Sequence, residues 1–260
     1  MCTKQTIFRF QPCEDSRINS ISACAIWLSD PTRFNDETDL NPQIRDRVDF
    51  SVFKNVDQFE KIVQILATNN PEVGNTLLLG KTGELGSPAN MIKDHAANPD
   101  LNFSNYFKEK FIDHIQSFGV TCFAPRLEMP AMWAYYAANA TGFALEYELE
   151  LGVKAIAQRS SEGYAFLNVD YSSEFDHEYC VSELIFTPTA SLKRLVAKKS
   201  TAWAHEEEIR LVYVDGKAGN FPMPYGLRLK AIYAGKKSSA KHRDQLANVA
   251  ARESVMFSSL

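Results

Sequence analysis

Alternation of apolar and polar positions predicts several β-strands along the chain. The clearest case is residues 143–149, where Leu145, Tyr147 and Leu149 alternate with two glutamates, as in a strand buried on one face. Runs rich in β-branched and aromatic residues predict further strands. These cover residues 6–10, 25–29, 120–124, 164–171, 206–214 and 229–234.

Helical spacing and capping residues predict the helices. They cover residues 18–25, 57–66, 104–118, 130–139, 187–196 and 239–250. Strands and helices interleave without the regular spacing of βαβ units, which favours an α+β fold. We therefore expect a single domain over residues 1–260, with a mixed, largely antiparallel sheet, flanking helices and a mainly helical insertion at 40–118.

The composition argues against several classes of function and cellular location. A hydrophobic content of 45% in 260 residues is enough for a core, and a formal net charge of −4 argues against non-specific nucleic-acid binding. Five cysteines without close pairing favour a reducing compartment. The first residues lack the apolar core of a secretory signal, and no run reaches the length of a membrane helix. We expect a cytoplasmic protein with no membrane contact.

Two segments resemble known motifs but do not meet their requirements for spacing or residue type. The segment 74–82 has five residues between its glycines, whereas a phosphate-binding loop needs four. His205-Glu206 would require a second histidine at position 209 to bind zinc, and that position is Ile209. We therefore expect no metal.

The segment from Trp203 to Arg210 stands out. In a strand beginning at 206, side chains alternate between faces, so Glu206, Glu208 and Arg210 form one charged row. The row could equally be an exposed face with weak salt bridges. Trp203 just upstream favours a cleft that binds a planar ring.

Two other clusters are candidates. Trp133 and Tyr136 share a helix face, which is typical of core packing but also of a stacking surface. Asn35 and Asp36 lie in a polar segment after an early strand and could be a turn that bonds its own backbone, or could line a site.

Together these pieces resemble the bacterial domain-of-unknown-function family 2971, over roughly residues 7–235. The features are Phe8-Arg9-Phe10, Phe34-Asn35-Asp36, Val120–Phe123, Trp133–Ala137 with Gly142, Val169–Tyr171, and Lys199 with Trp203, Glu206, Glu208 and Arg210. Glu37, where the family more often has Pro, is a departure, as is the long segment 40–118.

A more distant likeness is to ADP-ribosyltransferases, including toxins and phage-defence effectors, which pair an early-strand Arg with a late Glu-x-Glu. It implies that NAD is cleaved at the nicotinamide–ribose bond. Glu208 would then hold the ribose and stabilise the cation, Glu206 would orient the acceptor, and Arg9 would pair with the pyrophosphate.

The same likeness implies that Trp133 or Tyr136 stacks on a ring of NAD, with Asn35, Asp36, Trp203 and Arg210 near the cleft. The acceptor could be a protein, a nucleic acid or water. Two alternatives stay open. One is a non-catalytic nucleotide-binding or sensory module. The other is a metal-dependent nucleic-acid-processing enzyme that uses Glu206, Glu208 and Asp36.

Overall fold

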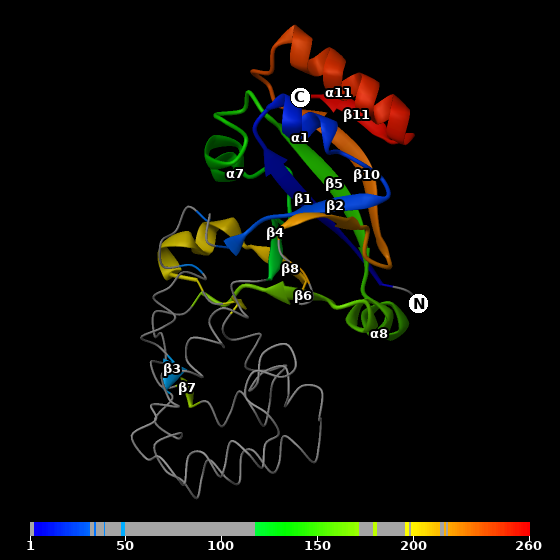
Figure 1. The fold of residues 1–260 in the computed structure, drawn as a ribbon. Helices are drawn as coiled ribbons and strands as arrows, with labels where there is room; N and C mark the ends of the chain where they lie inside the picture. The colour runs from blue at the N-terminus through cyan, green and yellow to red at the C-terminus, as the bar shows by residue number, and fades with distance from the viewer. Residues whose placement is uncertain are drawn as a thin grey trace, which may run out of the picture. The chain divides into compact units, whose positions relative to one another are not determined.

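The structure is a computed structural model of the chain (Figure 1). It describes residues 3–31, 34, 39, 48–49, 118–171, 179–180, 196–197, 199–213, 216 and 218–260.

The chain divides into two compact units. The first comprises residues 1–33, 118–171 and 199–260, and the second comprises residues 34–117 and 172–198. The predicted insertion at 40–118 therefore falls almost entirely in the second unit. In that unit the structure describes a short parallel pair, β3 (Val48–Asp49) with β7 (Tyr179–Cys180). The helices predicted at 57–66, 104–118 and 187–196 lie outside the described residues, apart from positions 118 and 196.

The larger sheet of the first unit has four strands. Its order is β1 (Lys4–Gln11), β5 (Phe143–Glu150), β10 (Leu227–Ala234) and β11 (Met256–Ser259). The pairs β1–β5 and β5–β10 are antiparallel, and β10–β11 is parallel. The strands predicted at 6–10, 143–149 and 229–234 are confirmed, whereas β11 was not predicted.

A three-stranded antiparallel sheet carries the charged segment. Its order is β4 (Gly119–Phe123), β8 (Ile209–Tyr213) and β6 (Tyr164–Asn168). Isolated bridges join it to the rest, at Phe8 with Ala124 and at Ser29 with Val120. A further antiparallel pair is β2 (Ala25–Leu28) with β9 (Gly219–Pro222). The mixed, largely antiparallel α+β fold is confirmed.

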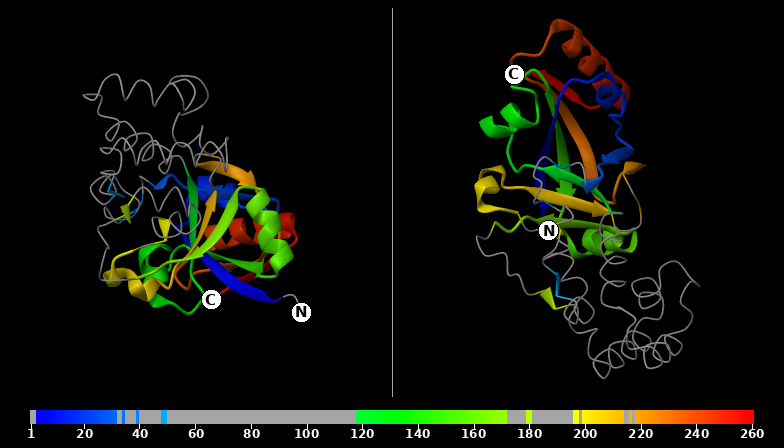
Figure 2. Two further views of the ribbon diagram at one scale, coloured as in Figure 1. Left: turned by 90° about the horizontal axis from the view of Figure 1, so that it is seen from below. Right: turned by 60° about the vertical axis from the view of Figure 1, so that its left-hand side comes forward.

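Helices cover both faces of the larger sheet (Figures 1 and 2). On one face, α1 (Asp15–Asn19) and α11 (Ala240–Glu253) bury Ile18 and Leu246 in a core with alternate residues of the strands, such as Ile7. On the other face, α7 (Pro130–Tyr135) packs Met132 against Phe8 and Phe10. The alternation of β1 between the two layers follows from its pleat.

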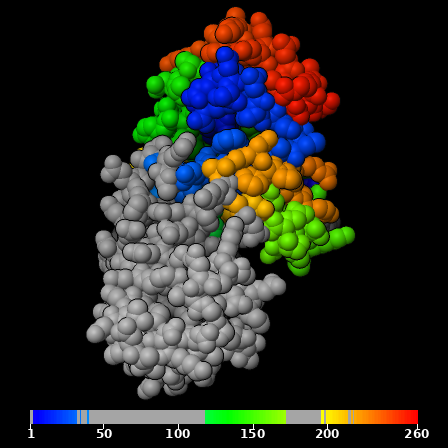
Figure 3. Space-filling model, in the orientation of Figure 1, coloured from blue at the N-terminus to red at the C-terminus, as the bar shows by residue number. Residues whose placement is uncertain are grey.

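The first and last parts of the described chain pack side by side. Figure 3 shows the blue N-terminal segment against the red C-terminal helix. Gln245 of α11 donates a hydrogen bond to Asp15 at 3.1 Å, and Arg252 donates one to the carbonyl of Ile21 at 2.8 Å. Ser239 caps α11 by accepting from the backbone N–H of His242, and the predicted helix at 239–250 is confirmed.

Several predicted boundaries are wrong. The helix expected at 18–25 is α1, which ends at Asn19. The helix expected at 130–139 ends at Tyr135, because Ala138, Asn139 and Ala140 have left-handed backbone with φ of 47°, 55° and 65°. The strand expected at 164–171 ends at Asn168.

Candidate functional site

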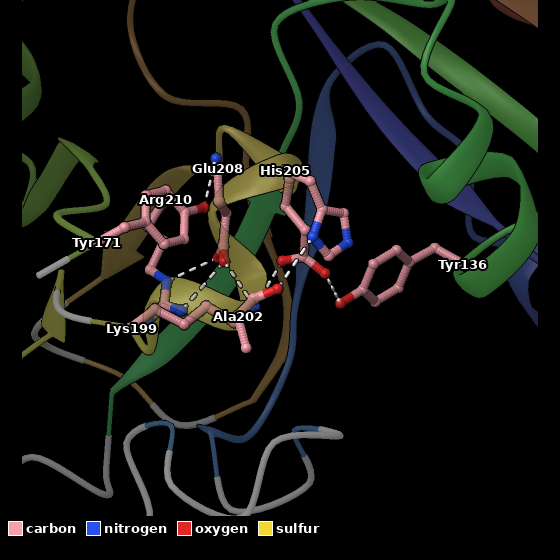
Figure 4. Close-up of polar contacts among 8 residues, drawn as sticks. Tyr136, Tyr171, Lys199, Ala202, His205, Glu208 and Arg210 are labelled. Atoms are coloured by element: carbon pink, nitrogen blue, oxygen red, sulfur yellow. Dashed lines mark hydrogen bonds and ion pairs between the residues drawn. The ribbon is translucent and has the colours of Figure 1, made fainter. Parts of the chain in front are cut away.

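Four charged side chains are buried together beside β8. Lys199, Glu206, Glu208 and Arg210 have relative exposures of 6%, 1%, 4% and 0%. Figure 4 shows the contacts of Lys199, Glu208 and Arg210, with Tyr171 and Tyr136 to either side. Buried charges are kept in proteins when they are paired and hydrogen-bonded, and these side chains form one connected network.

Glu208 is held by both cations. Arg210 Nε lies 2.7 Å from its Oε1, while Arg210 NH2 and Lys199 Nζ each lie 3.1 Å from its Oε2. Burial raises the pKa of Glu208, but the charge and hydrogen bonds of Arg210, with Lys199 and Cys122, outweigh it and bring the pKa to about 2. Glu208 is therefore ionised at neutral pH and its lone pairs are well occupied.

Glu206 has fewer partners. Its Oε2 accepts from Lys199 Nζ at 2.6 Å, and its Oε1 accepts from the Tyr136 hydroxyl at 2.7 Å. Contrary to the predicted strand at 206–214, Glu206 is the last residue of the 3-10 helix η3 (Thr201–Glu206), and β8 begins at Ile209. The two glutamates meet because both bind Lys199, rather than by alternation along a strand.

Local structure explains this arrangement. Ser200 caps η3 by accepting from the N–H of Ala202, and Glu207 ends it in the left-handed conformation with φ of 47°. That reversal lets two glutamates separated by one residue turn toward the same lysine. Tyr171 then fixes the start of β8, because its hydroxyl accepts the backbone N–H of Glu208 at 2.8 Å.

An aromatic surface lies on the outer side of η3. Tyr135, Trp203 and His205 contact one another, with ring centroids 6.0 to 6.3 Å apart. Tyr135 is 60% exposed and Trp203 is half-buried. Lys199 Nζ lies 5.0 Å from the Trp203 ring, a cation–π contact that links this surface to the buried glutamates. We call these three residues the aromatic platform.

Arg9 does not join this network. Its Nη1 donates to the carbonyl of Trp27 at 2.9 Å, and its Nε and Nη2 face the side-chain amide of Gln11, whose oxygen accepts from both when the amide is turned over. Burial lowers the pKa of Arg9. Arg9 alternates with Phe8 and Phe10, so it points away from the face of β1 on which α7 and Tyr136 pack.

The other predicted site residues have different fates. Trp133 packs edge-on against Phe10 and donates its indole N–H to the carbonyl of Leu127 at 2.8 Å, so it is a half-buried residue that packs against the core. Tyr136 and Trp203 do reach the site, and Arg210 serves it by holding Glu208. Asn35 and Asp36 lie outside the described residues.

Four residues of the site were not among the predicted ones: Lys199, Tyr135, Tyr171 and His205. His205 was considered only as part of an incomplete zinc motif. Lys199 was part of the resemblance but was given no role. Its position four residues before Trp203 was the signal that could have pointed to it. Tyr135 lies between Trp133 and Tyr136 in the sequence. Its exposure could not be predicted, because it depends on where the helix ends. Tyr171 acts through its hydroxyl on a backbone N–H, which leaves no sequence signal.

The fold and site define an α+β protein with a buried carboxylate–cation network beneath an exposed aromatic platform. Residues 132–211 match the model of a family described as "Protein of unknown function (DUF2971)", which confirms the resemblance to that family over this segment. The matched segment includes every residue of the network and the platform. The search of curated proteins and the search of solved structures found no match.

No helix in the described ranges is both long and apolar enough to cross a membrane.

Proposed function

We propose that the protein binds NAD at the aromatic platform and cleaves its nicotinamide–ribose bond, with Glu206 as the carboxylate that acts on the ribose. The observation that carries this proposal is the position of Glu206. It terminates the same short helix that presents Trp203 and His205, so a ring stacked on the platform would place an attached sugar near the carboxylate.

The chemistry requires a fixed negative charge. The bond between the ribose carbon and the ring nitrogen breaks with its electron pair leaving on nicotinamide, and positive charge develops on the sugar. A preorganised carboxylate in a water-poor site stabilises that charge. The acceptor, which is water or a macromolecule, then bonds to the same carbon and gives up a proton.

We assign the two glutamates different roles. Glu208 is a positioning residue, because Arg210 and Lys199 occupy both of its oxygens. Glu206 keeps one oxygen whose donor is a single half-buried tyrosine hydroxyl, so a ligand can replace that donor. This assignment exchanges the roles that the transferase likeness implies. It also leaves Arg9 out, and a pyrophosphate would have to bind elsewhere.

The test is nicotinamide release from NAD by the purified protein, with and without cell lysate as a source of acceptors. Wild type should release nicotinamide, and Glu206→Gln, assayed below its own melting temperature, should not. Glu148→Gln is the matched control, because Glu148 pairs with Lys4 outside the network and its side chain is 24% exposed. Absence of release by wild type under both conditions would refute the reaction.

A second candidate is a nucleotide-binding module without turnover. Its specific support is the burial of both glutamates, each at or below 4% exposure, which suits a structural network better than a catalytic one. This alternative predicts that NAD binds, as measured by calorimetry, without any nicotinamide release.

A metal-dependent nuclease is less well supported. Lys199 and Arg210 balance the charge of the two glutamates, which leaves little net attraction for a divalent cation. Magnesium-dependent processing of a nucleic acid by the purified protein would support this alternative.

The biological setting follows from the reaction. NAD cleavage is an activity of toxins and phage-defence effectors, so expression in a bacterial host should deplete NAD and slow growth. Among the described residues, Cys13, Cys24 and Cys122 form no disulfide, which suits the reducing cytoplasm where NAD is abundant. The proposed ligand is a small nucleotide, and the acceptor is a protein, a nucleic acid or water.

A further inference from the structure

The hydroxyl of Tyr136 covers one oxygen of the Glu206 carboxylate. It donates to Glu206 Oε1 at 2.7 Å across 70 residues of sequence. Within the part of the chain that the structure describes, it is the only donor to that oxygen, since Lys199 bonds to the other one. With Tyr136 in place, Glu206 is 1% exposed, so the carboxylate is closed to any ligand.

A phenol and a sugar present the same group to a carboxylate, an O–H donor at about 2.7 Å. We propose that Tyr136 gates the site: its hydroxyl holds the place on Glu206 that a ribose hydroxyl takes, and the tyrosine leaves when a ribonucleotide binds. This rests on the proposed function only in taking Glu206 as the anchor of the ligand.

The tyrosine stays a donor at neutral pH. Burial, reinforced by the hydrogen bond to the Glu206 carboxylate, raises the pKa of Tyr136. The ligand must therefore compete with an intact hydrogen bond to a charged acceptor, which is stronger than a bond between neutral groups. The strength of this hydrogen bond lowers the affinity of any ligand that binds to Glu206.

The position of Tyr136 in the chain suits a moving part. It caps the C-terminus of α7, a helix of only six residues. Three successive residues with left-handed backbone follow, Ala138 to Ala140, a conformation that costs energy in non-glycine residues. Tyr135, adjacent in sequence, belongs to the platform, so a ligand stacked there contacts the same helix end that carries the gate.

The experiment compares AMP with its 2′,3′-dideoxy analogue, which lacks both ring hydroxyls of the sugar. Affinities are measured by calorimetry for wild type and Tyr136→Phe. Removing the competing donor should tighten AMP binding roughly ten- to a hundred-fold, with no gain for the dideoxy analogue. Tyr233→Phe is the matched control, because Tyr233 donates a similar bond to Glu146 at 2.6 Å outside the site, and it should leave both affinities unchanged.

Two results would overturn the gate. One is equal AMP affinity in Tyr136→Phe and wild type. The other is an equal gain for both nucleotides, which would mean that the phenol blocks access without standing in for a sugar hydroxyl. Tyr136→Met, which also lacks the hydroxyl, repeats the measurement if the Phe variant melts below the assay temperature.

The gate and the reaction can fail separately. A ribose-specific gain without nicotinamide release from NAD supports the gate and refutes the cleavage. Nicotinamide release by wild type with no gain in Tyr136→Phe supports the cleavage and refutes the gate.

Discussion

The protein carries the same types of charged residue in two contrasting settings. Near the edge of the larger sheet, an outer pair joins Lys4 to Glu148 at 3.0 Å, with side-chain exposures of 47% and 24%. Beside β8, Lys199 pairs with Glu206 at 2.6 Å, with exposures of 6% and 1%. Both are lysine–glutamate pairs within hydrogen-bonding distance.

The contrast teaches that distance alone does not rank ion pairs. Water and salt screen the outer pair, so each of its partners is stable without the other. Neither partner of the inner pair can be left alone, because a buried charge without a counter-charge is very costly. Such a network is therefore poor evidence of added stability, even though breaking it by removing one partner is costly.

Removing Lys199 should have the largest effect. In Lys199→Met both glutamates lose a partner, so the free energy of unfolding should fall by about 3–5 kcal/mol. Urea denaturation measures it. Adding Glu206→Gln should recover part of the loss, because one uncompensated charge is then removed. A loss as small as that of an exposed pair would mean that water reaches the network.

Acid should weaken the inner network selectively. The pKa of Glu208 is about 2 when folded and near its ordinary value of 4.5 when unfolded. Its contribution, of the order of 3 kcal/mol, is therefore complete above the unfolded value and is lost as the pH falls from 4.5 toward 2. Unfolding free energies measured across that window should decline less steeply in Glu208→Gln. Parallel declines would contradict the depressed pKa.

Tyr136→Phe should have a smaller effect, about 1–2 kcal/mol, because Glu206 keeps its bond to Lys199 when the phenol is lost. Chemical denaturation beside wild type measures it. Stability equal to wild type would show that water replaces the hydroxyl at no cost.

Lys4→Met should have the smallest effect. The unfolding midpoint is expected to stay within experimental scatter of wild type at both low and high salt. A clear drop that salt suppresses would show that the outer pair contributes more than its exposure suggests, and would narrow the contrast with the inner pair.

Sequence patterns predicted several strands well. Leu145 lies in the core as the alternation at 143–149 indicated, and Ile7 and Leu229 lie in the core, in strands predicted from their β-branched and aromatic residues. The helix α8 (Val153–Ser161) was not predicted, because its sequence lacks a regular pattern of apolar residues. Val153 and Ile156 are 85% and 52% exposed, while Arg159 is 3% exposed, so the helix has no apolar stripe on its buried side.

The site was predicted in composition but not in geometry. Glu206, Glu208, Arg210, Trp203 and Tyr136 were all named, and all lie in or beside the network. Alternation along a strand was the wrong reason, because the left-handed Glu207 breaks it. No local pattern encodes the convergence on Lys199, and none shows that Arg9 turns to Gln11 and Trp27 instead.

The contact between Lys199 and Trp203 has a practical consequence. Indole emission responds to nearby charge and to stacking, so the platform contains its own optical reporter. The chain has three tryptophans, of which Trp27 is exposed and Trp133 is packed against Phe10. With Trp27 replaced by Phe, the remaining signal would come from one indole packed against the core and one at the site. Nucleotide titrations could then be followed by fluorescence without any label.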